Sequence, residues 1–209
     1  MSKGFFVVLE GGDYTGKGTQ SIRLAQHILD LSEDNDVLLT HEPTWRAKEI
    51  KKRLAEDGDA YSDARKMAEL YVEDRRIHTE EIIKPNLSKG VIVVGNRYAM
   101  STCVYQSLQG IPLSELVDMH CGIIEVPDIT ILLDIPPETA KLRAKNRSRA
   151  AEKKFEANVD FRNRVYAKYR ELAFSEEYQT NFGKVRVVDG KGAIEEVAKR
   201  IKFVFDSVY

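Results

Sequence analysis

The chain has 209 residues, of which 43% are hydrophobic and 31% charged, a composition typical of a globular protein. Its 32 basic and 33 acidic residues give a net charge of -1, so we expect it to bind neither nucleic acid nor a membrane. The longest apolar stretch near the N-terminus, residues 5–9, is too short to span a membrane, and two cysteines imply no disulfide framework. We therefore expect a cytoplasmic protein with one domain over residues 1–209.

Short apolar runs alternate along the chain with longer segments of helical spacing. The runs predict strands at Phe5–Leu9, Val37–Leu39, Val91–Val94, Ile129–Leu133 and Val185–Val188. The continuously apolar runs among them are typical of parallel strands that helices cover on both faces. Helical spacing is clearest over residues 22–29, 68–85 and 194–201. We therefore expect a three-layer α/β fold with a five-stranded parallel sheet flanked by helices, and the spacing leaves the strand order open.

A glycine-rich loop follows the first predicted strand and leads into the first predicted helix. Gly11, four further residues and then Gly16-Lys17 form the spacing of a loop that binds nucleotide phosphates. Its backbone N–H groups can point at one centre, the helix N-terminus adds partial positive charge, and Lys17 can reach the β- and γ-phosphates. The predicted ATP-binding residues of this loop are Gly11, Gly12, Asp13, Tyr14, Thr15, Gly16, Lys17, Gly18 and Thr19.

Gly18 departs from the usual pattern of such a loop, because Ser or Thr commonly stands there and offers a hydroxyl to Mg²⁺. Either Thr19, one position later, takes part of that role, or the ion holds more water. Switches, motors and kinases all carry a phosphate loop, so the reaction has to be inferred from the rest of the chain.

Four further sequence blocks follow the phosphate loop in order. They are His41-Glu42-Pro43, Tyr71-Val72-Glu73-Asp74-Arg75, Asn96-Arg97-Tyr98-x-x-Ser101-x-x-Val104-Tyr105-Gln106 and Leu133-Asp134-Ile135-Pro136-Pro137-Glu138. Together with the loop they resemble the thymidylate kinases, whose signature Asp-Arg-Tyr-x-x-Ser-x-x-Ala-Tyr-Gln is similar to the third block. The resemblance covers about residues 5–175. It implies a P-loop kinase fold, a homodimer, and Mg²⁺-dependent transfer of the γ-phosphoryl group of ATP to dTMP, which gives dTDP and ADP.

The acceptor in such a reaction needs cations for its phosphate and a flat surface for its base. Arg75 and Arg97 are the candidate phosphate ligands, because a guanidinium group matches phosphate oxygens. Arg97 follows a predicted buried strand, and the carboxyl ends of such strands border the ligand crevice of open α/β sheets. Tyr71 lies one helical turn before Arg75, so the two share a helix face. Purely structural interpretations remain open: Tyr71 as a core residue, and Arg75 on a solvated helix face.

The resemblance implies more specific roles for several residues. Tyr71 takes the place of an aromatic residue that stacks on thymine, with Arg75 also near the base. Ser101 and Gln106 are implied to read the base edge. Tyr105 is implied to lie beneath the sugar and Asp13 to accept from its 3′-hydroxyl, and Arg46 is a candidate phosphate contact. The complete predicted acceptor site is Asp13, Glu42, Pro43, Arg46, Tyr71, Arg75, Arg97, Tyr98, Ser101, Tyr105 and Gln106.

A basic segment from Lys141 to Lys154 holds seven cationic residues and one acidic residue. It is either a solvated helix end or a short arginine-rich lid, about residues 141–156, that closes over the transferring phosphoryl group. Family members with catalytic arginines in this lid lack an arginine in the phosphate loop, as this chain does. We therefore expect Arg143 to contact ATP. The predicted catalytic residues are Asp13, Lys17, Arg97, Arg147 and Arg149.

Asn96 stands where the family has an aspartate that helps to hold Mg²⁺ through water. We predict a water-mediated metal contact by Asn96 and a second metal contact by Thr19. Three other interpretations stay open: a kinase of the same fold acting on dUMP or another pyrimidine monophosphate, a weakly active nucleotide-binding regulator, and a nucleic-acid-binding module built on the basic segment. A panel of acceptor nucleotides distinguishes the first two from dTMP kinase activity.

Overall fold

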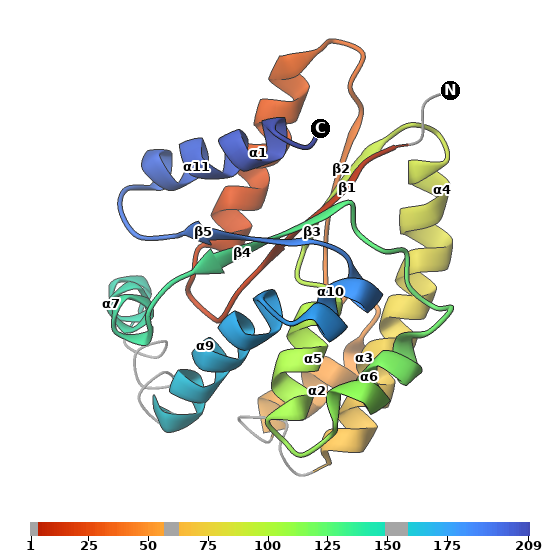
Figure 1. The fold of residues 1–209 in the computed structure, drawn as a ribbon, viewed down its shortest axis with the longest axis vertical. Coiled ribbons are helices and arrows are strands. Elements are labelled where there is room, and N and C mark those ends of the chain that lie inside the picture. The colour runs from red at the N-terminus through yellow and green to blue at the C-terminus, as the bar shows by residue number, and fades with distance from the viewer. Residues whose placement is uncertain (1–3, 57–62, 149–158) are drawn as a thin grey trace.

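The computed structural model describes residues 4–56, 63–148 and 159–209, and it has a parallel sheet between two layers of helices (Figure 1). The five strands are arranged in the order β2-β3-β1-β4-β5, and all neighbours pair in parallel. They are β1 (Phe6–Glu10), β2 (Val37–His41), β3 (Ile92–Asn96), β4 (Ile129–Asp134) and β5 (Val185–Asp189). The prediction of a three-layer α/β fold with five parallel strands is confirmed.

The central strand β1 shows why unbroken apolar runs form strands in this chain. Val7 and Leu9 face one helix layer, Phe6 and Val8 face the other, and none of the four is more than 1% exposed. Every strand extends one or two residues beyond the C-terminal end of its predicted run. The added terminal residues are all polar: Glu10, His41, Asn96, Asp134 and Asp189. Because the carboxyl ends of parallel strands meet at one edge, these side chains border the region where open α/β sheets bind ligands.

Helices α1 (Lys17–Leu31) and α11 (Ile194–Asp206) cover one face of the sheet (Figure 1). Apolar residues of both helices pack against this face: Leu24 and Ile28 from α1, and Val197, Ile201 and Phe205 from α11. Phe5 and Val37 are partly buried against the same cluster. This packing fixes the position of α1, and with it the end of the loop that leads into α1.

The other helices begin and end as follows: α2 (Lys48–Glu56), α3 (Ala64–His78), η1 (Thr79–Ile83), α4 (Lys84–Leu87), α5 (Ala99–Ser107), α6 (Leu113–His120), α7 (Pro137–Arg147), α9 (Val159–Ala173) and α10 (Glu176–Phe182). The segment α3–η1–α4 is one continuous helix with a π-helical turn, as the spacing over residues 68–85 predicted. Together with α5, α9 and α10 it supplies the apolar cluster on the second face of the sheet. Helices α5 and α9 pack on each other on this face.

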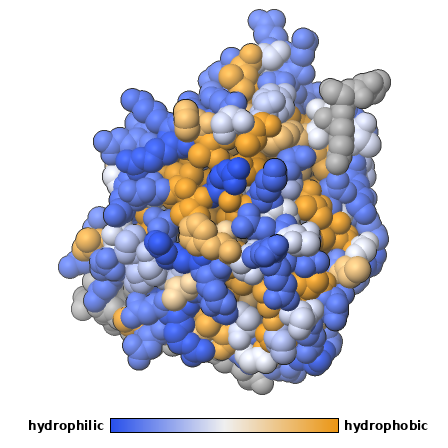
Figure 2. Space-filling model, in the orientation of Figure 1, coloured by the Kyte–Doolittle hydropathy of each residue, from blue (hydrophilic) through white to orange (hydrophobic). Residues whose placement is uncertain are grey.

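The surface is mixed in character. Figure 2 shows hydrophilic residues around the rim of one face and apolar residues reaching the surface in its centre. Phe174 and Phe203 are 71% and 76% exposed. None of the helices in the described part of the chain is long and apolar enough to cross a membrane.

Candidate active site

The loop between β1 and α1 has the backbone shape that phosphate binding requires. Gly11, Tyr14 and Gly16 have φ angles of 142°, 61° and 96°, so the chain curls through three positions with positive φ. A Cβ on Gly11 would lie 3.0 Å from the carbonyl oxygen of Leu133, a close approach that favours glycine. Gly16 precedes α1 and has no side chain to cap it. The first N–H groups of α1 are therefore available to bind an anion.

Lys17 is the first residue of α1, and its side chain folds back over the loop. Its Nζ donates to the carbonyl oxygens of Gly11 and Gly12 at 2.8 and 2.6 Å. Burial lowers the pKa of Lys17 to about 7, helped by repulsion from Arg97, while Asp13 and other negative charge oppose the shift. A phosphate group bound beside Nζ would favour the charged form and raise this pKa.

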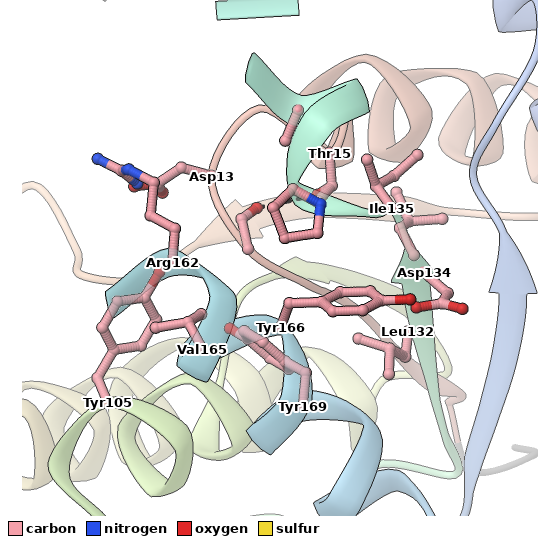
Figure 3. Close-up of a pocket in the computed structure, with 14 residues that line it drawn as sticks. Asp13, Thr15, Tyr105, Leu132, Asp134, Ile135, Arg162, Val165, Tyr166 and Tyr169 are labelled. Carbon is pink, nitrogen blue, oxygen red and sulfur yellow. Dashed lines mark hydrogen bonds and ion pairs between the residues drawn. The ribbon is translucent and has the colours of Figure 1, made fainter. Parts of the chain in front are cut away.

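Asp13 joins two arginines beside the loop. Arg97 Nη2 donates to Oδ1 of Asp13 at 2.6 Å, and Arg162 Nη1 donates to Oδ2 at 3.2 Å. Burial raises the pKa of Asp13, but the positive charges of Arg97, Lys17 and Arg162 outweigh it and hold the pKa at about 2. Figure 3 shows the Arg162 side chain reaching from α9 to Asp13, next to a pocket that Tyr105 also lines. Three cationic side chains thus gather at the phosphate loop, which suits a phosphate ligand.

Arg97 follows β3 and has a φ angle of 69°, a left-handed conformation that is uncommon for a residue with a side chain. Its backbone N–H donates to the carbonyl oxygen of Leu9 at 3.0 Å. Nη1 donates to the Gly11 carbonyl oxygen at 3.2 Å and to Ser101 Oγ at 3.0 Å. The guanidinium carbon lies 5.9 Å from the centre of the Tyr105 ring. Of the predicted acceptor residues, the structure therefore brings Asp13, Arg97, Ser101 and Tyr105 together at the phosphate loop.

Arg75 lies in a different setting, a buried polar network in which its own exposure is 1%. Its Nε donates to Glu42 Oε2 at 2.8 Å, and its Nη2 donates to Thr102 Oγ1 at 3.1 Å. Nη1 donates to Nε2 of His120 at 2.5 Å. The other carboxylate oxygen of Glu42 accepts from His78 Nδ1 at 2.9 Å. Arg75 and Glu42 neutralise each other inside the protein, and a contact of Arg75 with phosphate stays a prediction.

Two tyrosines flank Arg75. The guanidinium carbon of Arg75 lies 5.0 Å from the centre of the Tyr98 ring, within the range of a cation–π contact. Tyr71 is half-buried one turn before Arg75 on α3. Burial raises the pKa of Tyr71, and the charges of Arg97 and Arg75 oppose this shift. Tyr71 therefore lies within electrostatic reach of both arginines, and its contact with a base stays a prediction.

The remaining predicted acceptor residues lie on α5 and on the turn after β2. Gln106 is buried on α5. Pro43 follows a cis peptide bond, and the next residue, Thr44, is held by hydrogen bonds to Asp74 on α3. Arg46 is exposed, where it pairs with Glu81 and stacks on Trp45. The substrate contacts of these residues stay predictions.

Comparison with known proteins identifies the group to which this site belongs. The family model of thymidylate kinase matches residues 9–201. The chain belongs to the thymidylate kinase family. It is therefore a nucleotide-binding kinase that uses ATP, and the predictions of the family and of thymidylate kinase activity are confirmed.

Individual thymidylate kinases match along nearly the whole chain. That of Ruegeria pomeroyi is 36% identical over 200 residues, which cover 93% of this chain and 91% of that protein. A probable thymidylate kinase of Thermococcus gammatolerans is 32% identical over 206 residues, with 95% and 94% covered. The crystal structure of thymidylate kinase from Ehrlichia chaffeensis matches with a TM-score of 0.74 and 26% identity, over 97% of this chain and 99% of that chain.

Part of the lid that the thymidylate kinase resemblance implies can be described. Arg143 on α7 donates from Nη1 to the carbonyl oxygen of Thr15 at 2.9 Å and from Nη2 to that of Gly190 at 2.8 Å. It therefore ties α7 to the phosphate loop and to the connection between β5 and α11. Arg147 is exposed at the end of α7, and Arg149 lies outside the described residues. Roles for these arginines at ATP and in catalysis stay predictions.

The two residues predicted for Mg²⁺ are both neighbours of Gly18, Asn96 in space and Thr19 in the sequence. A Cβ on Gly18 would lie 3.7 Å from Nδ2 of Asn96, so the two unusual positions of this chain are neighbours. Thr19 is exposed in the next position of α1. Asp134, a nearby carboxylate at the end of β4, is paired with Arg170 at 2.7 Å. Within residues 4–56, 63–148 and 159–209, no group of three or more His, Cys, Asp or Glu side chains is placed to hold a metal ion.

Three residues of the site were not among the predicted ones: Glu10, Arg162 and Tyr169. Glu10 follows the first apolar run and precedes the first glycine of the loop, a position that could have drawn attention to it. Arg162 and Tyr169 are seven residues apart on α9, and this spacing of two helical turns places them on one face. No such face was evident without the position of α9 beside the phosphate loop.

Proposed function

We propose that this chain transfers the γ-phosphoryl group of ATP to the phosphate of dTMP and releases ADP and dTDP. The observation that supports this best is the position of Arg97, which bonds both to the Gly11 carbonyl of the phosphate loop and to Asp13. A guanidinium at that junction can bind the acceptor phosphate next to the transferred group. The acceptor phosphate is already ionised near neutral pH, so the reaction needs positioning and charge neutralisation rather than a general base.

We propose the following division of roles. The loop from Gly11 to Thr19, with Lys17 and Arg143, binds ATP, and Arg147 and Arg149 bring positive charge to the transferring group. Tyr71 stacks on the base, Tyr105 lies beneath the sugar and Asp13 accepts from the 3′-hydroxyl. The other acceptor contacts are assigned to Glu42, Pro43, Arg46, Arg75, Arg97, Tyr98, Ser101 and Gln106.

Mg²⁺ is the cofactor that we propose, and when bound it neutralises the phosphate oxygens of ATP. The residues beside Gly18 offer neutral oxygens, the amide of Asn96 and the hydroxyl of Thr19. This donor set fits an ion that keeps most of its ligands as water and phosphate oxygens, as Mg²⁺ commonly does. Glu42 has both carboxylate oxygens occupied by Arg75 and His78, and we assign the metal contacts to Asn96 and Thr19.

We further propose one domain over residues 1–209 that forms a homodimer in the cytoplasm. The single continuous sheet and the full-length match to the Ruegeria pomeroyi enzyme support one domain. The dimer and its location rest on the family resemblance. Light scattering during gel filtration tests the dimer, because a peak of twice the chain mass is expected and a single-chain mass would contradict it.

The experiment that tests the reaction is ADP release with Mg-ATP and a panel of deoxy- and ribonucleoside monophosphates. We expect selective turnover with dTMP, reduced at least about 100-fold in Arg97→Ala. Arg23→Ala is the matched control, because Arg23 is partly exposed, pairs with Glu195 at the start of α11 and should leave turnover unchanged. Selective turnover with dUMP instead would identify another acceptor. Nucleotide binding without any turnover would favour a regulator and contradict the proposal.

A further inference from the structure

Glu10, Ser101 and Tyr169 form a compact polar cluster beside the Arg97 side chain. Glu10 ends β1 with 0% exposure, Ser101 lies in the first turn of α5, and Tyr169 is buried on α9. Ser101 Oγ donates to Glu10 Oε2 at 2.8 Å, and the Tyr169 hydroxyl donates to the same oxygen at 3.3 Å. Arg97 Nη1 donates to both hydroxyls, at 3.0 Å to Ser101 and 3.3 Å to Tyr169. Three separate elements therefore meet beside Nη1 of Arg97, with Glu10 linked to it through the two hydroxyls.

The direction of these hydrogen bonds is fixed by chemistry. A guanidinium group only donates and an ionised carboxylate only accepts. The two hydroxyls between them therefore accept from Arg97. At least one of them points its proton at Glu10, and because the hydroxyls lie 2.9 Å apart, the other can donate to Glu10 or to its neighbour. Burial and the charge of Glu10 raise the pKa of Tyr169, which keeps its hydroxyl protonated and able to donate. The negative charge of Glu10 thus reaches Arg97 through two hydroxyl groups.

The same carboxylate also supports the backbone around Arg97. Glu10 Oε1 accepts from the backbone N–H of Tyr98 at 2.7 Å and from that of Ser101 at 3.0 Å. Such bonds satisfy the first N–H groups of α5, whose N-cap residue Tyr98 provides no side-chain cap. They hold the chain just after Arg97, whose left-handed φ of 69° is unfavourable for a residue with a Cβ.

Helix α9 contacts both members of the Asp13–Arg97 pair. Arg162 bonds to Asp13 at 3.2 Å, and Tyr169, two helical turns later on the same face, bonds to Arg97 at 3.3 Å. Figure 3 shows both side chains projecting from α9 toward the phosphate loop. The position of the Arg97 side chain therefore depends on the position of α9.

We propose that Glu10, Ser101 and Tyr169 are positioning residues that hold Arg97 ready to bind the phosphate of the acceptor nucleotide. This inference rests on the proposed function. It gives the Ser101 hydroxyl a task inside the protein, between Arg97 and Glu10, in addition to the acceptor contact proposed above. It also gives α9 a direct contribution to acceptor binding, although none of the three side chains needs to touch the substrate.

Tyr169→Phe is the sharpest test, because it removes one hydroxyl and leaves a ring that packs edge-on against Tyr105. We expect kcat/KM for dTMP to fall about tenfold and KM for ATP to stay unchanged. Glu10→Gln replaces one accepting carboxylate oxygen by a donating NH2 group. It should lower kcat/KM for dTMP further, about 100-fold. Tyr178→Phe on α10 is the control for loss of a hydroxyl from a buried tyrosine elsewhere, and its turnover should equal that of the unmodified protein.

Combining two substitutions distinguishes a positioning role of Tyr169 from a general effect on the structure. If Tyr169 acts through Arg97, then adding Tyr169→Phe to Arg97→Ala should not lower kcat/KM for dTMP any further. The inference would be overturned if the double variant lost kcat/KM by the product of the two separate factors. An unchanged kcat/KM in Tyr169→Phe alone would also overturn it. If the unmodified protein shows no turnover, the proposed function fails. Calorimetric measurement of dTMP binding then tests separately whether Tyr169 positions Arg97. Weaker dTMP binding by Tyr169→Phe than by the unmodified protein supports the inference; equal binding, or no binding by either, overturns it.

Discussion

His120 should make the stability of this protein depend on pH. Its Nδ1 donates to the Leu116 carbonyl oxygen at 2.6 Å, which leaves Nε2 unprotonated to accept from Arg75 at 2.5 Å. Protonation would direct a second N–H at the Arg75 guanidinium inside the protein. Burial and the charge of Arg75 accordingly lower the pKa of His120 to about 3, and the hydrogen bond to Leu116 opposes this shift.

The sign and size of the effect follow from the two pKa values. In the unfolded chain the histidine has a pKa of about 6.5, so between about pH 6.5 and pH 3 only the unfolded state binds the proton. The contribution of His120 to stability is therefore complete above about pH 6.5 and is lost as the pH falls. Lowering the pH from about 6.5 to 5.0 covers about 1.5 units at about 1.36 kcal/mol each, a loss of about 2 kcal/mol. Set against a typical unfolding free energy of about 5–15 kcal/mol, this loss is readily measured.

Urea unfolding at pH 7.0 and at pH 5.0 tests this reasoning, with His120→Gln as the informative variant. Gln can still offer an oxygen to Arg75 but does not titrate, so its loss of stability on acidification should be about 2 kcal/mol smaller than that of the unmodified protein. His41→Gln, at an exposed position, should lose as much stability as the unmodified protein. Equal losses in His120→Gln and the unmodified protein would refute the assigned protonation state of His120.

Three further outcomes are expected. Glu42→Gln should lower the free energy of unfolding by about 3 kcal/mol at pH 7, because it leaves the buried charge of Arg75 without its partner, whereas Glu81→Gln at an exposed pair should cost under about 1 kcal/mol in the same urea titration. Lys17→Met should reduce ADP release at least about 100-fold, and residual turnover within tenfold of the unmodified protein would contradict its role at the phosphates. Asn96→Asp should lower the Mg²⁺ concentration at half-maximal ADP release, and an unchanged value would place the metal away from this position.

The parts of this protein that sequence patterns predicted well are those whose causes are local. Apolar runs mark all five strands, although the edge strands β2 and β5 are only partly buried. The glycine spacing marks a loop whose backbone shape depends on its own residues. The same patterns ended each strand too early, because Glu10 and Asn96 are polar and an apolar run stops before them. Glu10 is nonetheless fully buried, since four hydrogen-bond donors surround its carboxylate.

The acceptor side of the site depends on contacts between distant segments, and this is why it was harder to predict. For Arg75, the sequence suggested either a solvated helix face or a phosphate contact, because a charged residue seldom stays buried alone. The structure adds a third state, in which Glu42 supplies the countercharge and His120 the remaining acceptor. These partners come from the end of β2 and from α6, 33 and 45 residues away in the chain. Acceptor specificity depends on such long-range packing, whereas the phosphate loop is encoded within a few consecutive residues.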